Sequence, residues 1–239
     1  MSQPATQNTA VVLLSGGLDS TVALADTLTR QRVVCTLTFD YGQRAASKER
    51  AAARAIANHY KLPHKEIALP WLAELLPVAM TPSFAMSGAK RGAAERPMTQ
   101  DEWFDVTQVW VPNRNGVLLN IAASYAEAMG AAAVVYGANA EEGATFPDNT
   151  VAFRDKLNEA LAFSTLSGVR VETPVGRLAK TEIVQRGLEL DVPFQFIWSC
   201  YQGLEEQCGQ CSSCLRVKQA RDQVSYISGK MAAIPFKES

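Results

Sequence analysis

The sequence predicts an α/β protein with a doubly wound parallel sheet and a small, cysteine-rich C-terminal segment. Short runs of β-branched and apolar residues alternate with helix-forming stretches along most of the chain. This order is typical of a parallel sheet covered by helices on both faces. A glycine-rich turn directly follows the first apolar run, and four of the five cysteines lie between residues 200 and 214. These three observations define the expected architecture.

The alternation can be followed element by element. The predicted strands are short β-rich runs that end at turn residues, and they cover residues 11–14, 33–39, 65–69, 133–137 and 169–173. The predicted helices are longer stretches rich in good helix formers, and they cover residues 45–60, 117–129, 153–165 and 180–190, with one more starting at Thr21.

One long loop and one boundary define the predicted domain organisation. Residues 80–105 are polar, small and glycine-bearing, and long loops of this kind are functional lids or disordered segments. We expect a lid or mobile insertion there, with passive disorder as the alternative. The main domain is predicted over residues 8–192 and the cysteine segment over residues 193–239.

Composition narrows the functional classes. With 239 residues and 47% hydrophobic content, the chain can bury one sizeable core with a small appendage. A net charge of −1 provides no basic field for nucleic acid. No apolar run reaches the length of about 18 residues that a membrane span needs, and the polar N-terminus lacks a signal-peptide pattern. We expect a cytoplasmic homodimer that acts on small molecules.

The glycine-rich turn SGGLDS, residues 15–20, predicts an anion site. Adjacent glycines let the backbone turn sharply, so N–H groups of the turn and of the next helix point at one place. No lysine follows the glycines, unlike in kinase-type phosphate loops. The acidic Asp19 beside a phosphate makes sense if a divalent cation, Mg²⁺, sits between them. The alternative is a strand-to-helix turn that binds no ligand.

The cysteines predict a metal centre. Their spacing is C-x7-C-x2-C-x2-C, and two-residue gaps let neighbouring thiolates turn back onto one ion. A closed shell of four thiolates is the usual structural zinc site, and an iron–sulfur cluster is the main competitor. Cys35 lies in a predicted strand and is most simply a small buried residue. The predicted metal ligands are Cys200, Cys208, Cys211 and Cys214.

Several polar segments follow strands and should meet at one edge of the sheet, where ligands of open parallel sheets bind. They are the glycine turn and residues 40–42, 137–139 and 173–174. Lys180, at a predicted helix start, could neutralise phosphate, although a solvated lysine is the commoner case. Arg114 could pair with a carboxylate or phosphate. Its neighbours Asn113 and Asn115 could cap the helix or contact ligand.

The SGGLDS turn resembles the signature of the PP-loop ATP pyrophosphatases, which cleave ATP between its α- and β-phosphates and transfer AMP to a substrate oxygen. Further motifs make the resemblance specific to the 7-cyano-7-deazaguanine synthase family and run over nearly the whole chain. These motifs are DYGQR at 40–44, VPNRN at 111–115, FPDN at 146–149, LAKTEIV at 178–184 and the four-cysteine tail.

The resemblance implies an ATP-dependent, AMP-forming carbon–nitrogen ligase. It would convert 7-carboxy-7-deazaguanine and ammonia into 7-cyano-7-deazaguanine, through an acyl adenylate and an amide, in queuosine and archaeosine biosynthesis. ATP, Mg²⁺ and zinc are the implied cofactors, and free ammonium is the expected nitrogen source because no amidase-like nucleophile and base stand out.

The resemblance also assigns residues to roles. The implied catalytic residues are Asp19, Lys180 and Arg114, and the implied substrate contacts are Arg114, Asn115, Phe146 and Asp148. The residues implied to bind ATP and pyrophosphate are Leu13, Leu14, Ser15, Gly16, Gly17, Leu18, Asp19, Ser20, Thr21, Val22 and Lys180.

The chain departs from the family pattern at three places. Asn113 replaces a common glycine, Ala45 replaces a common histidine, and Asn149-Thr150 stand where Cys-Arg is common. The substrate and the product, nitrile or amide, therefore stay open. A paralogue with another acceptor, another PP-loop enzyme such as a tRNA-modifying ligase, and a non-catalytic zinc module that binds a partner are the alternatives.

Overall fold

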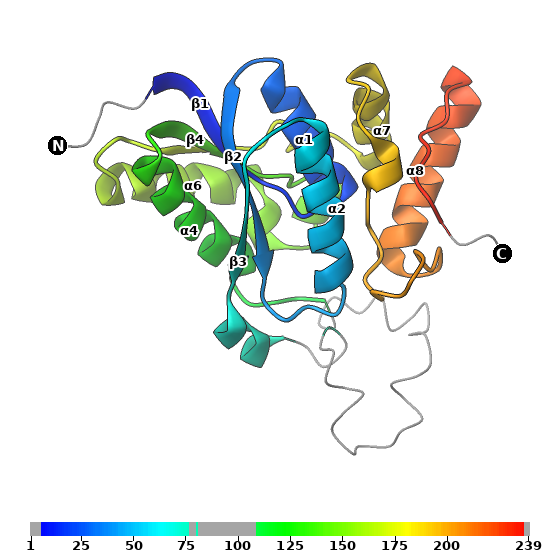
Figure 1. Ribbon diagram of the computed structural model, residues 1–239, viewed down its shortest axis with the longest axis horizontal. Helices are drawn as coiled ribbons and strands as arrows, with labels where there is room; N and C mark the ends of the chain where they lie inside the picture. Colours follow the sequence, from blue (N-terminus) through cyan, green and yellow to red (C-terminus); the bar gives the residue numbers. More distant parts are fainter. Residues whose placement is uncertain (1–5, 77–79, 81–108, 237–239) are drawn as a thin grey trace.

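The protein folds around one five-stranded sheet in which all strands are parallel, in the order β3-β2-β1-β4-β5. The computed structural model describes residues 6–76, 80 and 109–236 (Figure 1). The strand order places β1 at the centre of the sheet, and the order of the strands reverses beside it. In open parallel sheets, ligands bind beyond the carboxyl ends of the strands at such a point.

Each strand is followed by a helix or a helical turn. The strands are β1 Thr6–Leu13, β2 Arg32–Asp40, β3 His64–Ala68, β4 Ala131–Val135 and β5 Arg170–Glu172. The helices are α1 Leu18–Leu28, α2 Ala46–His59, α4 Arg114–Ala128, α5 Ala140–Gly143, α6 Val151–Ser164, α7 Lys180–Glu189 and α8 Ser212–Ser228. Shorter 3₁₀ turns are η1 Pro70–Leu75, η5 Pro147–Asn149 and η6 Phe194–Phe196.

The sheet divides the core into two apolar clusters, one on each face. Alternate residues of β1 supply both, because side chains of a strand point to opposite faces: Val12 joins the cluster with α1, α2, α7 and α8, and Val11 joins the cluster with α4 and α6. Figure 1 shows α1, α2 and α7 on one side of the sheet, and α4 and α6 on the other. The sheet is therefore covered on both faces, as the sequence predicted.

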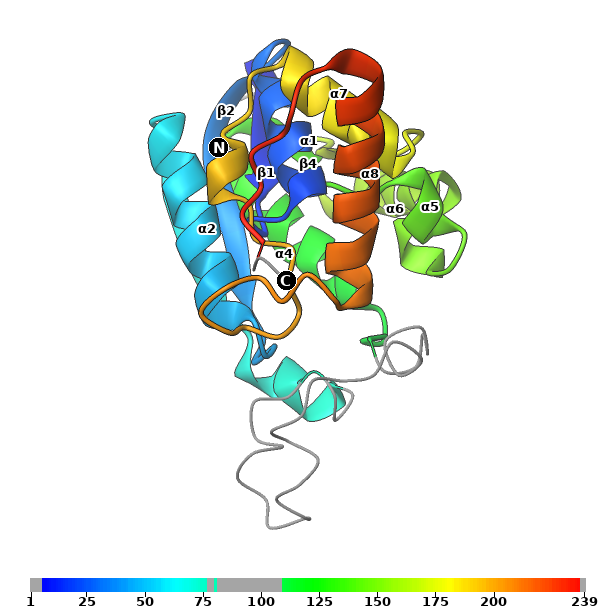
Figure 2. The same ribbon diagram turned by 90° about the vertical axis from the view of Figure 1, so that its right-hand side faces the viewer.

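The C-terminal helix α8 is part of this core. Its Val217, Ala220 and Val224 are buried in the same cluster as the α7 residue Ile183. In Figure 2, α8 stands at the front beside α7 and α1. The sequence analysis did not predict this helix.

The remaining predictions on the fold have different outcomes. All five predicted strands and the helices after them form, with ends that differ by a few residues. The lid predicted for residues 80–105 lies outside the described residues, apart from Met80. The division at residues 192 and 193 stays a prediction. No helix within the described ranges combines the length and apolar character that crossing a membrane would need.

The edge strand β3 carries a histidine whose protonation should destabilise the fold. The Nδ1 atom of His64 lies 2.9 Å from the Thr36 hydroxyl, and its Nε2 atom is buried with no hydrogen-bond partner among the described residues. Burial lowers the pKa of His64, and the nearby Glu66 opposes that shift. The unfolded chain therefore binds the proton more readily than the folded chain.

We expect the free energy of unfolding to fall as the pH drops below about 6.5, the ordinary pKa of histidine. Urea unfolding between pH 5 and pH 8 measures this decline. His64→Gln should flatten it, and His59→Gln, which changes the only other histidine, should leave it intact. An equal decline in both variants would contradict the assignment to His64.

Candidate active site

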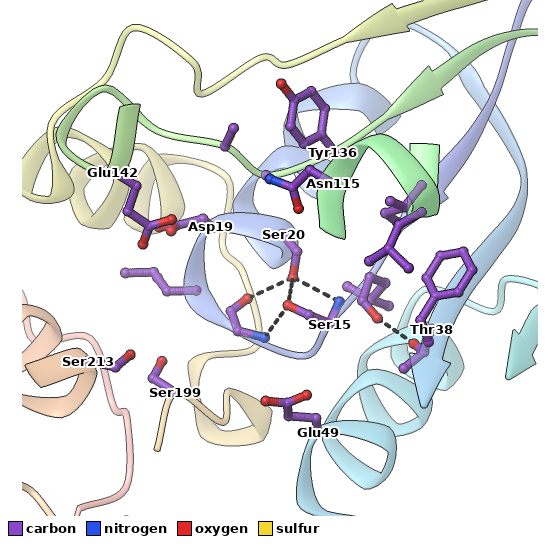
Figure 3. A pocket seen from close by; sticks show the side chains of 18 of the residues that line it. Ser15, Asp19, Ser20, Thr38, Glu49, Asn115, Tyr136, Glu142, Ser199 and Ser213 are labelled. Atoms are coloured by element: carbon purple, nitrogen blue, oxygen red, sulfur yellow. Dashed lines mark hydrogen bonds between the residues drawn. The ribbon is translucent and has the colours of Figure 1, made fainter. Parts of the chain in front are cut away.

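A cavity of about 250 Å³ opens at the carboxyl ends of β1, β2 and β4. Its walls come from segments far apart in the sequence, including the glycine turn, α4, α7 and the start of the cysteine segment. Figure 3 shows the turn at the centre, with Glu49 on one side and Glu142 on the other. A concave site with a few convergent polar groups at this edge is the expected ligand site of such a sheet.

The glycine turn has the form of an anion cradle. The Ser15 and Ser20 hydroxyls lie 3.0 Å apart, the Ser15 N–H donates to the Ser20 hydroxyl, and the Gly17 N–H donates to the Ser15 hydroxyl (Figure 3). Helix α1 begins immediately afterwards, and within the described chain no side chain caps it. The N–H groups of its first turn are therefore available to an anion.

Two glycines hold the turn in place through close contacts. Gly16 has a φ of 81°, and a Cβ there would lie 2.7 Å from the Ala52 Cβ of α2. A Cβ on Gly137, after β4, would lie 2.5 Å from the Ser20 backbone nitrogen. Neither position can carry a side chain without moving backbone. The Gly16 carbonyl also accepts a hydrogen bond of 2.9 Å from the Trp198 N–H, so the segment before the cysteines contacts the turn.

Asp19, in the first turn of α1, and Lys180, the first residue of α7, form a buried ion pair. The Lys180 Nζ donates to the Asp19 Oδ2 at 2.7 Å and lies 3.6 Å from the Glu142 Oε1. Their side chains are only 9% and 14% exposed. Burial alone would lower the pKa of Lys180, but the attraction of Asp19 and Glu142 outweighs it and raises that pKa. Lys180 thus stays a cation at the cavity wall.

The other oxygen of Asp19 fits a divalent cation. Asp19 Oδ2 accepts from Lys180 and from Asn139 Nδ2 at 2.9 Å, whereas the buried Oδ1 has no hydrogen-bond partner among the described residues. Carboxylate oxygens are the ligands that Mg²⁺ takes, together with phosphate oxygens and water. This orphaned oxygen beside the glycine turn could therefore hold a divalent cation next to a bound phosphate.

Arg114, the first residue of α4, lies between two cavities. Its Nη1 is 3.3 Å from the Tyr41 hydroxyl, and the neighbouring Tyr41 raises the pKa of Arg114 more than burial lowers it. Asn113 precedes it at the N-cap position with a φ of 52°, a left-handed conformation that asparagine tolerates. The Asn113 side chain makes no capping bond within the described chain. The left-handed backbone therefore explains why an asparagine suits this position, and side-chain capping does not.

A second cavity of about 210 Å³ adjoins the first and shares Arg114, Glu142, Asn149 and Tyr201 with it. The rings of Trp110 and Phe146 line it and lie parallel, with centroids 5.7 Å apart and an interplanar angle of 3°.

Asp148 lies at the wall of the second cavity and is only 5% exposed. Its Oδ2 accepts a hydrogen bond of 3.1 Å from the Asn115 N–H. The Asn115 amide also donates to the Asp148 carbonyl and to Asn149 Oδ1. The carboxylate is thus held in a fixed orientation from α4.

The four cysteines come together as predicted. Their four Sγ atoms lie within 4.8 Å of one another, and those of Cys208 and Cys214 are 3.9 Å apart. Backbone N–H groups donate to Cys200 Sγ and Cys208 Sγ at 3.3–3.4 Å, which favours thiolates. Tetrahedral Zn–S bonds of about 2.3 Å place sulfurs about 3.8 Å apart, so the cluster fits a single zinc ion.

The sequence-predicted site residues fall into three groups. Leu13, Leu14, Ser15, Gly17, Leu18, Asp19, Ser20, Arg114, Asn115 and Lys180 line the first cavity, and Arg114, Phe146 and Asp148 line the second. Gly16 packs on α2, the Thr21 hydroxyl donates to the Gly17 carbonyl at 2.7 Å, and Val22 is buried in the core. The structure does not bring these last three side-chain positions to a cavity wall.

Several cavity residues were not assigned by the sequence analysis. Glu49 lies on α2 and Glu142 on α5, and both line the first cavity. Burial raises the pKa of Glu49, and a hydrogen bond of 2.8 Å from the Gln43 amide opposes that shift. Tyr201 lines both cavities, and burial raises its pKa to about 12. Only Tyr201 had a signal in the sequence, since it directly follows the first cysteine.

A parallel sheet in this order, with an SGGLDS turn after its central strand, defines the PP-loop class of α/β folds. The chain belongs to the QueC family, because the family model described as "Queuosine biosynthesis protein QueC" matches residues 9–225. This confirms the family that the motifs indicated.

Curated relatives support the same assignment. The chain is 47% identical over 219 residues to a 7-cyano-7-deazaguanine synthase from Pelotomaculum thermopropionicum, covering 88% of this chain and 95% of the relative. It is 46% identical to one from Desulforudis audaxviator over the same shares of the two chains. It is 39% identical to one from the archaeon Methanosarcina mazei, covering 88% of this chain and 92% of the relative.

Removal of one cysteine ligand should release the metal and destabilise the protein, because metal binding and folding are coupled. We expect Cys211→Ser to lose bound metal in elemental analysis and more than about 4 kcal/mol of unfolding free energy. Cys35→Ala is the matched control, since Cys35 is buried in β2, in the apolar cluster that contains α4 and α6, and is not one of the four clustered cysteines. A Cys211→Ser protein that keeps its metal would contradict the assignment.

Proposed function

We propose that the protein is an ATP-dependent ligase that converts 7-carboxy-7-deazaguanine and ammonia into 7-cyano-7-deazaguanine. The reaction consumes two ATP molecules and releases two AMP and two pyrophosphate. Family membership and the names of the curated relatives support this substrate and product. The residues around the two cavities support the adenylation chemistry.

One observation carries the proposal: an anion cradle and an aromatic, carboxylate-bearing cavity share a wall at Arg114. An acyl adenylate needs this arrangement, because its nucleotide half and its acyl half must bind side by side with the reacting phosphate between them. The first cavity would take ATP, and the second would take the planar heterocycle.

In the first step, a carboxylate oxygen attacks the α-phosphorus of ATP, and the bond to the β-phosphate oxygen breaks. Negative charge develops on the departing pyrophosphate. The first-turn N–H groups of α1 and the Lys180 ammonium would stabilise that charge, since preorganised donors in a dry site act strongly on developing charge. Mg²⁺, held by Asp19, would supply charge neutralisation of the phosphates when bound.

Ammonia then attacks the acyl carbon, AMP leaves, and an amide forms. A second ATP adenylates the amide oxygen, and loss of AMP and protons leaves the nitrile. Arg114, Asn115, Phe146 and Asp148 would orient the substrate during both rounds. Zinc in the four-cysteine site would have a structural role, because four thiolates leave no open coordination position.

The product of the reaction tests the proposal most directly. Purified protein is incubated with the carboxylate, ATP and ammonium, and the product mass and released pyrophosphate are measured. We expect the nitrile, with pyrophosphate release that depends on the carboxylate. An amide alone would favour a paralogue that stops after one round, and ATP left intact with the carboxylate would contradict the proposal.

Lys180→Ala should lower kcat by roughly 10²- to 10³-fold, the usual effect of removing one group that stabilises transition-state charge. KM for ATP should change less, because the loop N–H groups remain. Lys156→Ala, on the exposed face of α6 where Lys156 pairs with Glu159, is the control and should be unchanged. A variant with raised KM and normal kcat would assign Lys180 to ground-state binding instead.

A further inference from the structure

We propose that Arg216, on helix α8, binds the ring carbonyl oxygen of the heterocycle in the second cavity. This inference rests on the proposed function and adds a specificity-determining residue to it. The two-cavity arrangement leaves one cation of the second cavity without a role, and Arg216 is that cation. Its position makes the cysteine segment part of the substrate site.

Arg216 lines the second cavity but not the first. Its side chain is half-buried, and it forms no hydrogen bond or ion pair with any residue that the structure describes. The other cation of this cavity, Arg114, contacts the Tyr41 hydroxyl and lines both cavities. A half-buried guanidinium whose N–H donors have no hydrogen-bond partner among the described residues is a binding group for an acceptor of the ligand.

The other walls of the second cavity fit the rest of a guanine-like ring. The ring has a donor edge, formed by a ring N–H and an amino group, and Asp148 offers carboxylate acceptors to it. Trp110 and Phe146 provide the apolar surface on which planar bases stack. The ring carbonyl, beside the donor edge, then needs a donor, and Arg216 is a cationic donor at this wall with no hydrogen bond to a described residue.

Phosphate is the competing ligand for any exposed arginine. The anion cradle and the Lys180 ammonium lie in the first cavity, which Arg216 does not line. Arg114 lies on the shared wall, and an acyl adenylate would place its phosphate there. Arg216 is therefore on the heterocycle side of the reacting bond. We expect it to affect binding of the heterocycle and not of ATP.

The metal centre fixes the position of Arg216. Cys211 is the N-cap residue of α8 and Cys214 lies in its first turn, so a metal bound by the four cysteines would tie this end of the helix to the segment before it. Tyr201, just after Cys200, lines the same cavity. The cysteine segment thus supplies two walls of the second cavity.

Steady-state kinetics of Arg216→Ala test the proposal. We expect KM for 7-carboxy-7-deazaguanine to rise roughly tenfold to hundredfold, as for loss of a charged hydrogen bond, with KM for ATP unchanged. Arg221→Ala is the matched control on the same helix, because Arg221 pairs with Asp222 and lies over the Phe236 ring. Arg216→Lys, which keeps the positive charge, should raise this KM less than Arg216→Ala does. Thermal unfolding of each variant shows whether a raised KM comes from misfolding.

A substrate analogue with sulfur in place of the ring carbonyl oxygen isolates the contact, because sulfur is a weaker acceptor and the neighbouring ring N–H is kept. Wild-type enzyme should discriminate against this analogue, and Arg216→Ala should have lost that discrimination. If Arg216→Ala discriminates as well as the wild type, or has a raised KM for ATP, the proposed role of Arg216 is wrong. The proposed function of the enzyme would be unaffected by that result. Failure of the wild type to consume the carboxylate would overturn the proposed function as well.

Discussion

The buried ion pair between Lys180 and Asp19 is the interaction on which the site depends. It joins the start of α7 to the first turn of α1, two segments far apart in the sequence, at 2.7 Å. Desolvating both charges is expensive, and removal of one partner from such a pair typically costs about 3–5 kcal/mol. Apolar side chains in place of the pair would often be as stable or more stable. The pair lies at the wall of the first cavity, so we infer that it is kept for binding and not for stability.

Backbone contact fixes the cradle as firmly as charge does. Gly137 lets the end of β4 approach the first turn of α1, where a Cβ would lie 2.5 Å from the Ser20 nitrogen. The central strand, its neighbour and the helix start are thus held together without intervening side chains. The N–H donors are aimed before any ligand arrives, and this preorganisation is what stabilisation of a leaving pyrophosphate requires.

The sequence was sufficient for the sheet, the glycine turn and the cysteine cluster, because each has a local signal. β-rich runs mark the strands, adjacent glycines mark the turn, and cysteine spacing marks the cluster. Residues such as Glu49, Glu142 and Arg216 carry no such signal, since a charged residue on a helix is usually solvated. Their place at a cavity wall follows from how the helices pack around the two cavities, which no short motif encodes.

The hydrogen bond from Trp198 to the Gly16 carbonyl ties the cysteine segment to the cradle. Gly203 packs closely against the residues before α2, because a Cβ there would lie 2.5 Å from the Arg44 carbonyl oxygen. The tail is therefore not an interchangeable module. A chimera that grafts the cysteine segment of a relative onto this sheet would have to transfer its counterparts of residues 198–203 together with the surfaces they touch on the turn and at the start of α2.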